Sequence, residues 1–162
     1  AAEAKYRGVI DAAPDAIVLA GYMRTVGPAV LTAYPNRILN THPSLLPAFP
    51  GAHALEDALA HGVKLAGVTV HFVDASLDGG PIIAQEPTPV FEGDDARALH
   101  ARIQMREHQM LPEVVRDLAA GVFHEHDRRH ARRRGQPIDL AHFSDSQNLR
   151  AGCPHSLQIS DG

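Results

Sequence analysis

The fold is indicated by one stretch, DAIVLAGYMRTVGPAVLTAYPNRILNTH, which occupies residues 15–42. Its first part, DAIVLAG (15–21), is a short apolar run between Pro14 and Gly21, which is typical of a strand buried on both faces of a parallel sheet. NRILNTH (36–42) predicts a second strand, and VGPAVLTAY between them has the length of a short helix. The stretch therefore predicts a strand, helix and strand unit of an α/β fold.

The middle of the chain predicts a helix followed by two strands. HALEDALAHG (53–62) reads as a helix that ends at Gly62, because glycine tolerates the left-handed conformation that closes many helices. AGVTVHFV (66–73) and PIIAQEPTPV (81–90) predict strands around the turn-rich DASLDGG. Since a connection this short favours antiparallel pairing, we expect a hairpin here.

A long helix is expected from Asp94 to about Ala120. Asp94 or Asp95 can cap its start, and Gly121 can end it. Its apolar stripe comprises Leu99, Ile103, Met110, Leu111, Val114 and Leu118. Glu107 falls on the same stripe, because it lies four residues from both Ile103 and Leu111. We therefore expect this carboxylate to be at least partly buried, with a partner that offsets its desolvation.

Composition and charge exclude several classes of protein. The 162 residues carry a formal net charge of −4, with 44% hydrophobic and 21% charged residues. These values fit one globular domain and give no reason to expect nucleic acid, and no apolar run approaches the roughly 18 residues of a membrane span. Cys153 is the only cysteine, which suits a reducing cytoplasm. The start lacks Met and any signal-like segment, so we expect a cytoplasmic protein that begins inside a domain.

The character of the sequence changes after Gly121. Residues 1–121 carry all the predicted elements and are expected to form one partial domain. Residues 122–162 show no sustained hydrophobic period and include five clustered arginines in RRHARRR. We expect them to form an irregular or disordered tail.

Three polar residues can form a site for acyl transfer. Asn40 and His42 lie two positions apart at the end of a predicted strand, so they project to the same side, and Asp78 lies in the turn SLDGG. An amide and a protonated imidazole can stabilise an oxyanion, while a carboxylate can favour the protonated ring and relay a proton. Because spacing shows no Ser or Cys nucleophile with a base, direct attack by a substrate amine is the simpler reaction. The same residues can instead cap backbone groups, and spacing alone leaves that alternative open.

Four segments, AGYMR, NTHPSLLPAFPGAH, GVTVHFVDASLDGGPIIAQ and RIQMREHQMLP, resemble in order those of the phosphoribosylglycinamide formyltransferase family of purine biosynthesis. The match runs from about Pro14 to Gly121. The resemblance implies a Rossmann-like three-layer α/β fold, with a mostly parallel sheet and an antiparallel C-terminal portion. The family's opening strand and phosphate-binding loop have no counterpart before Ala1, so we expect a fragment without its phosphate anchor.

The resemblance also implies a reaction and its catalytic residues. The family passes a formyl group from 10-formyltetrahydrofolate to the amine of phosphoribosylglycinamide. By resemblance, Asn40 holds the formyl oxygen, His42 acts as general acid or electrostatic stabiliser, and Asp78 keeps His42 charged. The implied partners are these small molecules, without nucleic acid, membrane or metal, and the protein is expected to be a monomer or homodimer.

Binding residues follow from the same comparison. The residues implied to contact the folate are Leu19, Met23, Arg24, Thr25, Val26, Ile38, Asn40, Val73 and Asp78. The residues implied to contact the ribonucleotide are Thr41, Pro43, Gln104 and Glu107, with Glu107 holding ribose hydroxyls.

Two alternatives remain open, a different enzyme and a non-catalytic fragment. Formyltetrahydrofolate deformylase uses a similar Asn, His and Asp to send the formyl group to water, but Pro43 and Leu45 fit the transferase pattern better. Methionyl-tRNA formyltransferase continues into a second domain that residues 122–162 do not resemble. A non-catalytic binding or assembly fragment is the other alternative, although the arginine cluster lacks the interleaved aromatics of a nucleic-acid surface.

Overall fold

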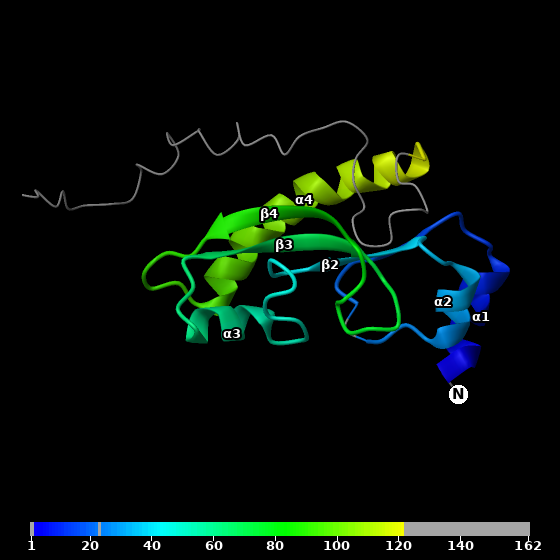
Figure 1. Cartoon of the computed structure of the whole chain (residues 1–162), viewed down its shortest axis with the longest axis horizontal. Coiled ribbons are helices and arrows are strands. Elements are labelled where there is room, and N and C mark those ends of the chain that lie inside the picture. The colour runs from blue at the N-terminus through cyan, green and yellow to red at the C-terminus, as the bar shows by residue number, and fades with distance from the viewer. Residues whose placement is uncertain (1, 23, 122–162) are drawn as a thin grey trace, which may run out of the picture. The chain divides into compact units, whose positions relative to one another are not determined.

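The computed structural model describes residues 2–22 and 24–121, and the predictions for Met23 and for the 122–162 tail lie outside the described residues. The elements in chain order are α1 (Ala2–Asp11), β1 (Ile17–Leu19), α2 (Pro28–Ala33), β2 (Ile38–His42), α3 (Ala54–Ala60), β3 (Leu65–Phe72), β4 (Ile82–Pro89) and α4 (Ala96–Ala119) (Figure 1). The strand, helix and strand unit, the hairpin and the long helix are confirmed. Helix α1 was not predicted from the sequence.

Four strands form one mixed sheet in the order β1-β2-β3-β4. β1 pairs with β2 in parallel, while the β2–β3 and β3–β4 pairs are antiparallel. The α/β class and the antiparallel C-terminal portion are confirmed. Within the described residues, however, the parallel part is one pairing of three, so this region is not mostly parallel. The short connection after β3 turns the chain straight back, which accounts for the antiparallel β3–β4 pair.

The expectation that the first strand is buried on both faces is wrong for these residues. Val18, at the centre of β1, is 39% exposed. β1 is the edge strand of the described sheet and has a neighbour on one side only. Apolar composition predicted the strand, whereas its neighbours decide its burial.

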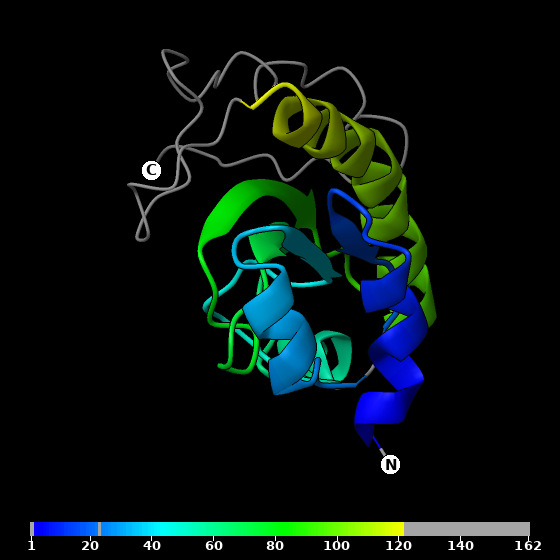
Figure 2. The same ribbon diagram turned by 90° about the vertical axis from the view of Figure 1, so that its right-hand side faces the viewer.

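Helices cover both faces of the sheet, and two clusters form the core (Figure 2). On one face α4 packs against Leu39 of β2 and against the apolar residues of β3. On the other face Val30 and Tyr34, from and just after α2, pack against Ile38. Since adjacent residues of a strand point to opposite faces, Leu39 and Ile38 separate the two clusters.

Helix α4 follows its predicted pattern. Its N-cap is Asp95, whose side chain accepts a hydrogen bond from the backbone nitrogen of Ala98 at 2.7 Å. Gly121, just after the helix, has a φ of 67°, the conformation that glycine adopts at least cost. The buried residues of the helix are Leu99, Ile103, Met110 and Val114, four of the six predicted. In the described part of the chain, no helix is long and apolar enough to cross a membrane.

A charged clamp joins the start of α4 to the end of β4. Arg102 donates two hydrogen bonds to Asp94, at 2.6 and 2.9 Å, and a third to the carbonyl oxygen of Pro89 at 2.6 Å. Its guanidinium also lies 4.4 Å from the ring centroid of Phe91. The side-chain hydrogen bonds from Arg102 lower the pKa of Asp94 below its ordinary value.

Replacing Asp94 with Asn should lower the free energy of unfolding by about 1–2 kcal/mol at pH 7, because the bidentate charged pair becomes a charged–neutral one. Since the pKa of Asp94 is lowered on folding, its contribution is fully present above pH about 4 and is lost as pH falls through the folded-state pKa. Urea unfolding at several pH values measures both effects. Glu92→Gln removes the same charge from an exposed position nearby and is the control. Equal stability of the two variants at pH 7 would contradict the clamp.

Candidate active site

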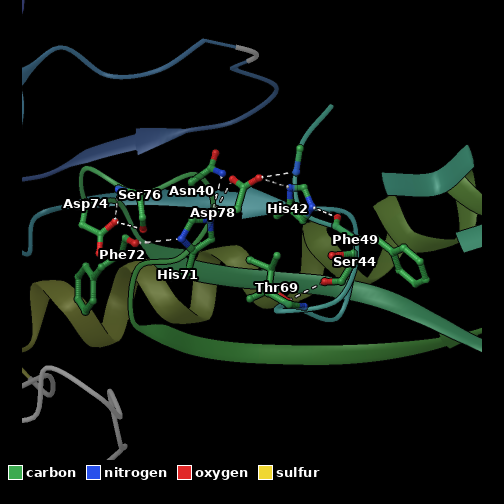
Figure 3. Close-up of polar contacts among 12 residues, drawn as sticks. Asn40, His42, Ser44, Phe49, Thr69, His71, Phe72, Asp74, Ser76 and Asp78 are labelled. Atoms are coloured by element: carbon green, nitrogen blue, oxygen red, sulfur yellow. Dashed lines mark hydrogen bonds and ion pairs between the residues drawn. The ribbon is translucent and has the colours of Figure 1, made fainter. Parts of the chain in front are cut away.

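The strand pairing places four polar side chains on one face of the sheet. Asn40 pairs with His71 and His42 pairs with Thr69 across β2 and β3 (Figure 3). Directly opposite residues of antiparallel strands project to the same face, and positions two apart share that face. The side-chain amide nitrogen of Asn40 lies 3.2 Å from Nε2 of His71. This face is the one opposite α4.

The loop after β3 adds a carboxylate to this group. Asp78 Oδ2 lies 3.6 Å from Nδ1 of His42, and its Oδ1 lies 3.9 Å from Nε2 of His71. The backbone nitrogen of Gly51 donates to Oδ2 at 2.8 Å and holds the carboxylate in place. The structure thus brings together the three residues that the sequence predicted as catalytic, Asn40, His42 and Asp78.

Backbone constraints explain the SLDGG turn that carries Asp78. Asp78 itself has a φ of 50°, in the left-handed region that Asp tolerates better than most residues. A Cβ at Gly80 would collide with the backbone carbonyl of Phe72, so only glycine lets the chain pass this close to the end of β3. Ser76 tightens the same loop, because its backbone nitrogen and its hydroxyl both donate hydrogen bonds to Oδ1 of Asp74.

The proline-rich loop after His42 is fastened to the sheet by Thr69. Its buried hydroxyl accepts from the backbone nitrogen of Leu46 at 3.1 Å and donates to the carbonyl of Ser44 at 2.7 Å. Gln85 of β4 donates to Thr69 at 2.9 Å and to the Leu46 carbonyl at 2.8 Å. The loop so fixed places the carbonyl oxygen of Phe49 2.9 Å from Nε2 of His42. The His42 ring therefore lies between two acceptors, the Phe49 carbonyl and Asp78.

His71 is a site residue that the sequence reasoning missed. Its side chain is 2% exposed, and its Nδ1 lies 2.9 Å from the carbonyl oxygen of Phe72. Burial lowers the pKa of His71 below its ordinary value, although the Phe72 carbonyl and Asp78 oppose that effect. The sequence did contain a signal for His71. Side chains of the predicted strand AGVTVHFV alternate between two faces, and its only ionisable residue, His71, shares a face with Thr69.

The residues implied to bind folate divide into two groups. Leu19, Val26 and Val73 are partly buried and pack against Ile38, which is 1% exposed and belongs to the core. Arg24 and Thr25, on the loop after β1, are exposed. The apolar residues of this set therefore lie together in one packed cluster.

The residues implied to bind the ribonucleotide lie on other surfaces. Thr41, between Asn40 and His42, faces the α4 side of the sheet and donates a hydrogen bond to Oε1 of Glu107 at 3.0 Å. Glu107 is half-buried, as predicted, and Thr41 is its partner. Pro43 is partly buried at the end of β2, and Gln104 is exposed on α4.

This arrangement is suited to stabilising negative charge that develops on an oxygen atom. It combines an amide donor, an imidazole held beside a carboxylate, and a buried second imidazole. Among the described residues, no three His, Cys, Asp or Glu side chains gather as a metal-binding group.

Comparison with known proteins assigns the family. The family described as "Formyl transferase" matches residues 2–115. The chain belongs to the formyl transferase family. A curated phosphoribosylglycinamide formyltransferase of Mycobacterium tuberculosis is 56% identical over 106 residues, which are 65% of this chain and 49% of that protein. The resemblance stated from sequence is thereby confirmed.

Solved structures in this family share the fold. Glycinamide ribonucleotide transformylase 1 from Symbiobacterium toebii gives a TM-score of 0.76 at 52% identity, covering 79% of this chain and 60% of that chain. A formyltetrahydrofolate deformylase from Pseudomonas syringae gives 0.73 at 32% identity, covering 78% of this chain and 43% of that chain. The chain spans about half the length of the curated relatives it matches.

Replacing Thr69 with Val should lower the free energy of unfolding by about 1–3 kcal/mol, because the buried Ser44 carbonyl loses its donor. Thr88→Val is the matched control. Its hydroxyl is buried and has no hydrogen-bond partner in the part of the chain that the structure describes, so valine should leave stability unchanged or raise it. Chemical unfolding of both variants tests the anchoring role of Thr69, and equal losses would contradict it.

Proposed function

We propose that this chain forms the formyl-transfer part of a phosphoribosylglycinamide formyltransferase of purine biosynthesis. The reaction transfers the formyl group of 10-formyltetrahydrofolate to the amine of 5-phosphoribosylglycinamide. The observation that carries the proposal is the convergence of Asn40, His42 and Asp78 on one face of the sheet. The choice of substrates is supported by the similarity to named formyltransferases.

The proposed reaction begins with direct attack of the substrate amine on the formyl carbon. A carbon–nitrogen bond forms, and the formyl oxygen becomes an oxyanion. Asn40 is the more exposed of the two β2 residues and offers an N–H donor to that oxygen. His42 is 5% exposed, so a proton donated from its ring would act on the oxyanion with little screening by water.

Collapse of the tetrahedral intermediate completes the transfer. The bond between the formyl carbon and N10 of the folate breaks, and a proton that the amine gives up must reach N10. His42, when protonated, can give its own proton to N10 and then take up the one that the amine gives up, while the Asp78 carboxylate 3.6 Å from its ring favours the protonated form. The backbone nitrogen of Gly51 donates to Oδ2 of Asp78, the same oxygen that lies nearest His42, so the carboxylate is held beside His42.

We propose that the two substrates bind on different parts of this fold. The folate would contact Leu19, Met23, Arg24, Thr25, Val26, Ile38, Asn40, Val73 and Asp78. The ribonucleotide would contact Thr41, Pro43, Gln104 and Glu107. For Glu107 the support is its geometry, since Thr41 engages Oε1 and no hydrogen bond to Oε2 occurs among the described residues, which leaves that oxygen for a ribose hydroxyl.

A second candidate is the hydrolysis of formyltetrahydrofolate. It is favoured by the similarity to the Pseudomonas syringae deformylase at 32% identity. The same donors would then stabilise attack by water instead of an amine. Product analysis distinguishes the two reactions, because the transferase makes formylglycinamide ribonucleotide and the hydrolase releases formate.

Asn40→Ala and His42→Ala should each slow the chemical step by about 10²-fold or more, because each removes one stabiliser of the oxyanion. Folate affinity should change little. Single-turnover assays measure this in the chain as it stands and in a chimera completed with the segments of the M. tuberculosis relative that the chain does not cover. Wild-type rates in both variants would remove these residues from the mechanism.

Glu107→Gln should weaken ribonucleotide affinity by about 1.5–3 kcal/mol, the range for hydrogen bonds to charged groups, while the Thr41 contact is kept by the amide oxygen. Folate affinity should stay the same, because Glu107 lies on the other face of the sheet. Titration calorimetry of the chimera with each ligand measures both, and Glu92→Gln controls for net charge. An unchanged ribonucleotide affinity in Glu107→Gln would contradict the assignment of Glu107 to ribonucleotide binding.

A further inference from the structure

We propose that His71 is a positioning residue that fixes the side-chain amide of Asn40 with its NH₂ group turned toward the His71 ring. This inference rests on the proposed function only for its catalytic consequence. The orientation itself follows from hydrogen bonding around His71.

The first step concerns Nδ1 of His71. It lies 2.9 Å from the carbonyl oxygen of Phe72, which can only accept. Nδ1 therefore carries a hydrogen in either protonation state of the ring. This fixes the tautomer of the neutral ring, in which Nε2 has a lone pair and no hydrogen.

The second step concerns the charge of the ring. The side chain is 2% exposed, and a buried imidazole resists a second proton. The groups that act on it are Asp78 and Asp74, whose carboxylates raise the pKa of His71, and His42, which lowers it. Burial is the largest of these effects, so the pKa of His71 falls below its ordinary value and the ring is neutral at pH 7.

The third step assigns the amide. A neutral His71 with its hydrogen on Nδ1 presents an acceptor at Nε2, which lies 3.2 Å from Nδ2 of Asn40. Asn40 therefore donates to His71 through one Nδ2 hydrogen and keeps the second for another acceptor. With a ring of the other tautomer, the amide would turn its oxygen to His71 and place the donor elsewhere.

The catalytic consequence is that His71 keeps an N–H donor of Asn40 in a fixed place before substrate arrives. A donor that needs no reorientation stabilises an oxyanion more effectively than one that must turn first. Acid should undo the arrangement, because a proton on Nε2 replaces the acceptor with a donor. The protonated ring would then turn to Asp78, whose Oδ1 lies 3.9 Å away.

Nitrogen NMR of the uniformly labelled chain tests the orientation without any need for activity. We expect the neutral His71 ring to carry its hydrogen on Nδ1, with exposed His100 and His108 as internal references. Below pH 6.5 the Asn40 side-chain resonances should change together with those of His71. A hydrogen on Nε2 of the neutral ring would overturn the proposal. So would Asn40 side-chain resonances that stay unchanged while His71 titrates.

Two variants test the catalytic consequence in the chimera. His71→Phe keeps a planar ring but removes the acceptor, and should lower kcat about tenfold or more while leaving KM for both substrates within about twofold. His71→Gln restores an acceptor near the position of Nε2 and should recover most of kcat. Equal kcat in His71→Phe and wild type would overturn the catalytic role. If the wild-type chimera itself transfers no formyl group, the proposed function fails, whereas the NMR result still decides the orientation of Asn40.

Discussion

The antiparallel register between β2 and β3 is the constraint on which the site depends. It sets Asn40 opposite His71 and His42 opposite Thr69, so four polar side chains from two distant segments share one face. A shift of one residue would send Asn40 and His42 into the apolar cluster under α4 and bring Leu39 to the site. The apolar residues that alternate with the polar ones therefore hold the catalytic geometry, because burying them fixes the register.

Two loops add the remaining residues of the site, and each loop is held to the sheet by a different set of contacts. The loop after His42 is fastened by the hydroxyl of Thr69 and the amide of Gln85. The turn that carries Asp78 is fixed by the close passage of Gly80 over the end of β3. A bulge beside His71, where Val70 pairs with Ala84 and His71 with Ile82, falls at the same end of β3. Hydrogen bonds and backbone contacts, and not apolar packing alone, therefore locate His42 and Asp78.

The opposite face of β2 has a separate role. Thr41 lies between Asn40 and His42 but points to α4, where it meets the half-buried Glu107. The hydrogen bond offsets part of the cost of placing a carboxylate on an apolar stripe, and it links the end of β2 to the long helix. One strand end thus contributes Asn40 and His42 to the proposed formyl-transfer face and Thr41 to the face under α4.

Local patterns in the sequence were sufficient for the elements and for part of the site. Alternation, caps and turn residues predicted the strands, the hairpin, the limits of α4 and the shared side of Asn40 and His42, because those signals act within a few residues. Tertiary structure alone decided which segments meet. It paired His71 with Asn40, placed Thr41 against Glu107, left Val18 of β1 exposed and made the β2–β3 pairing antiparallel. These features depend on contacts between residues far apart in the chain. A local hydrophobic pattern does not indicate which distant residue will lie opposite a given position.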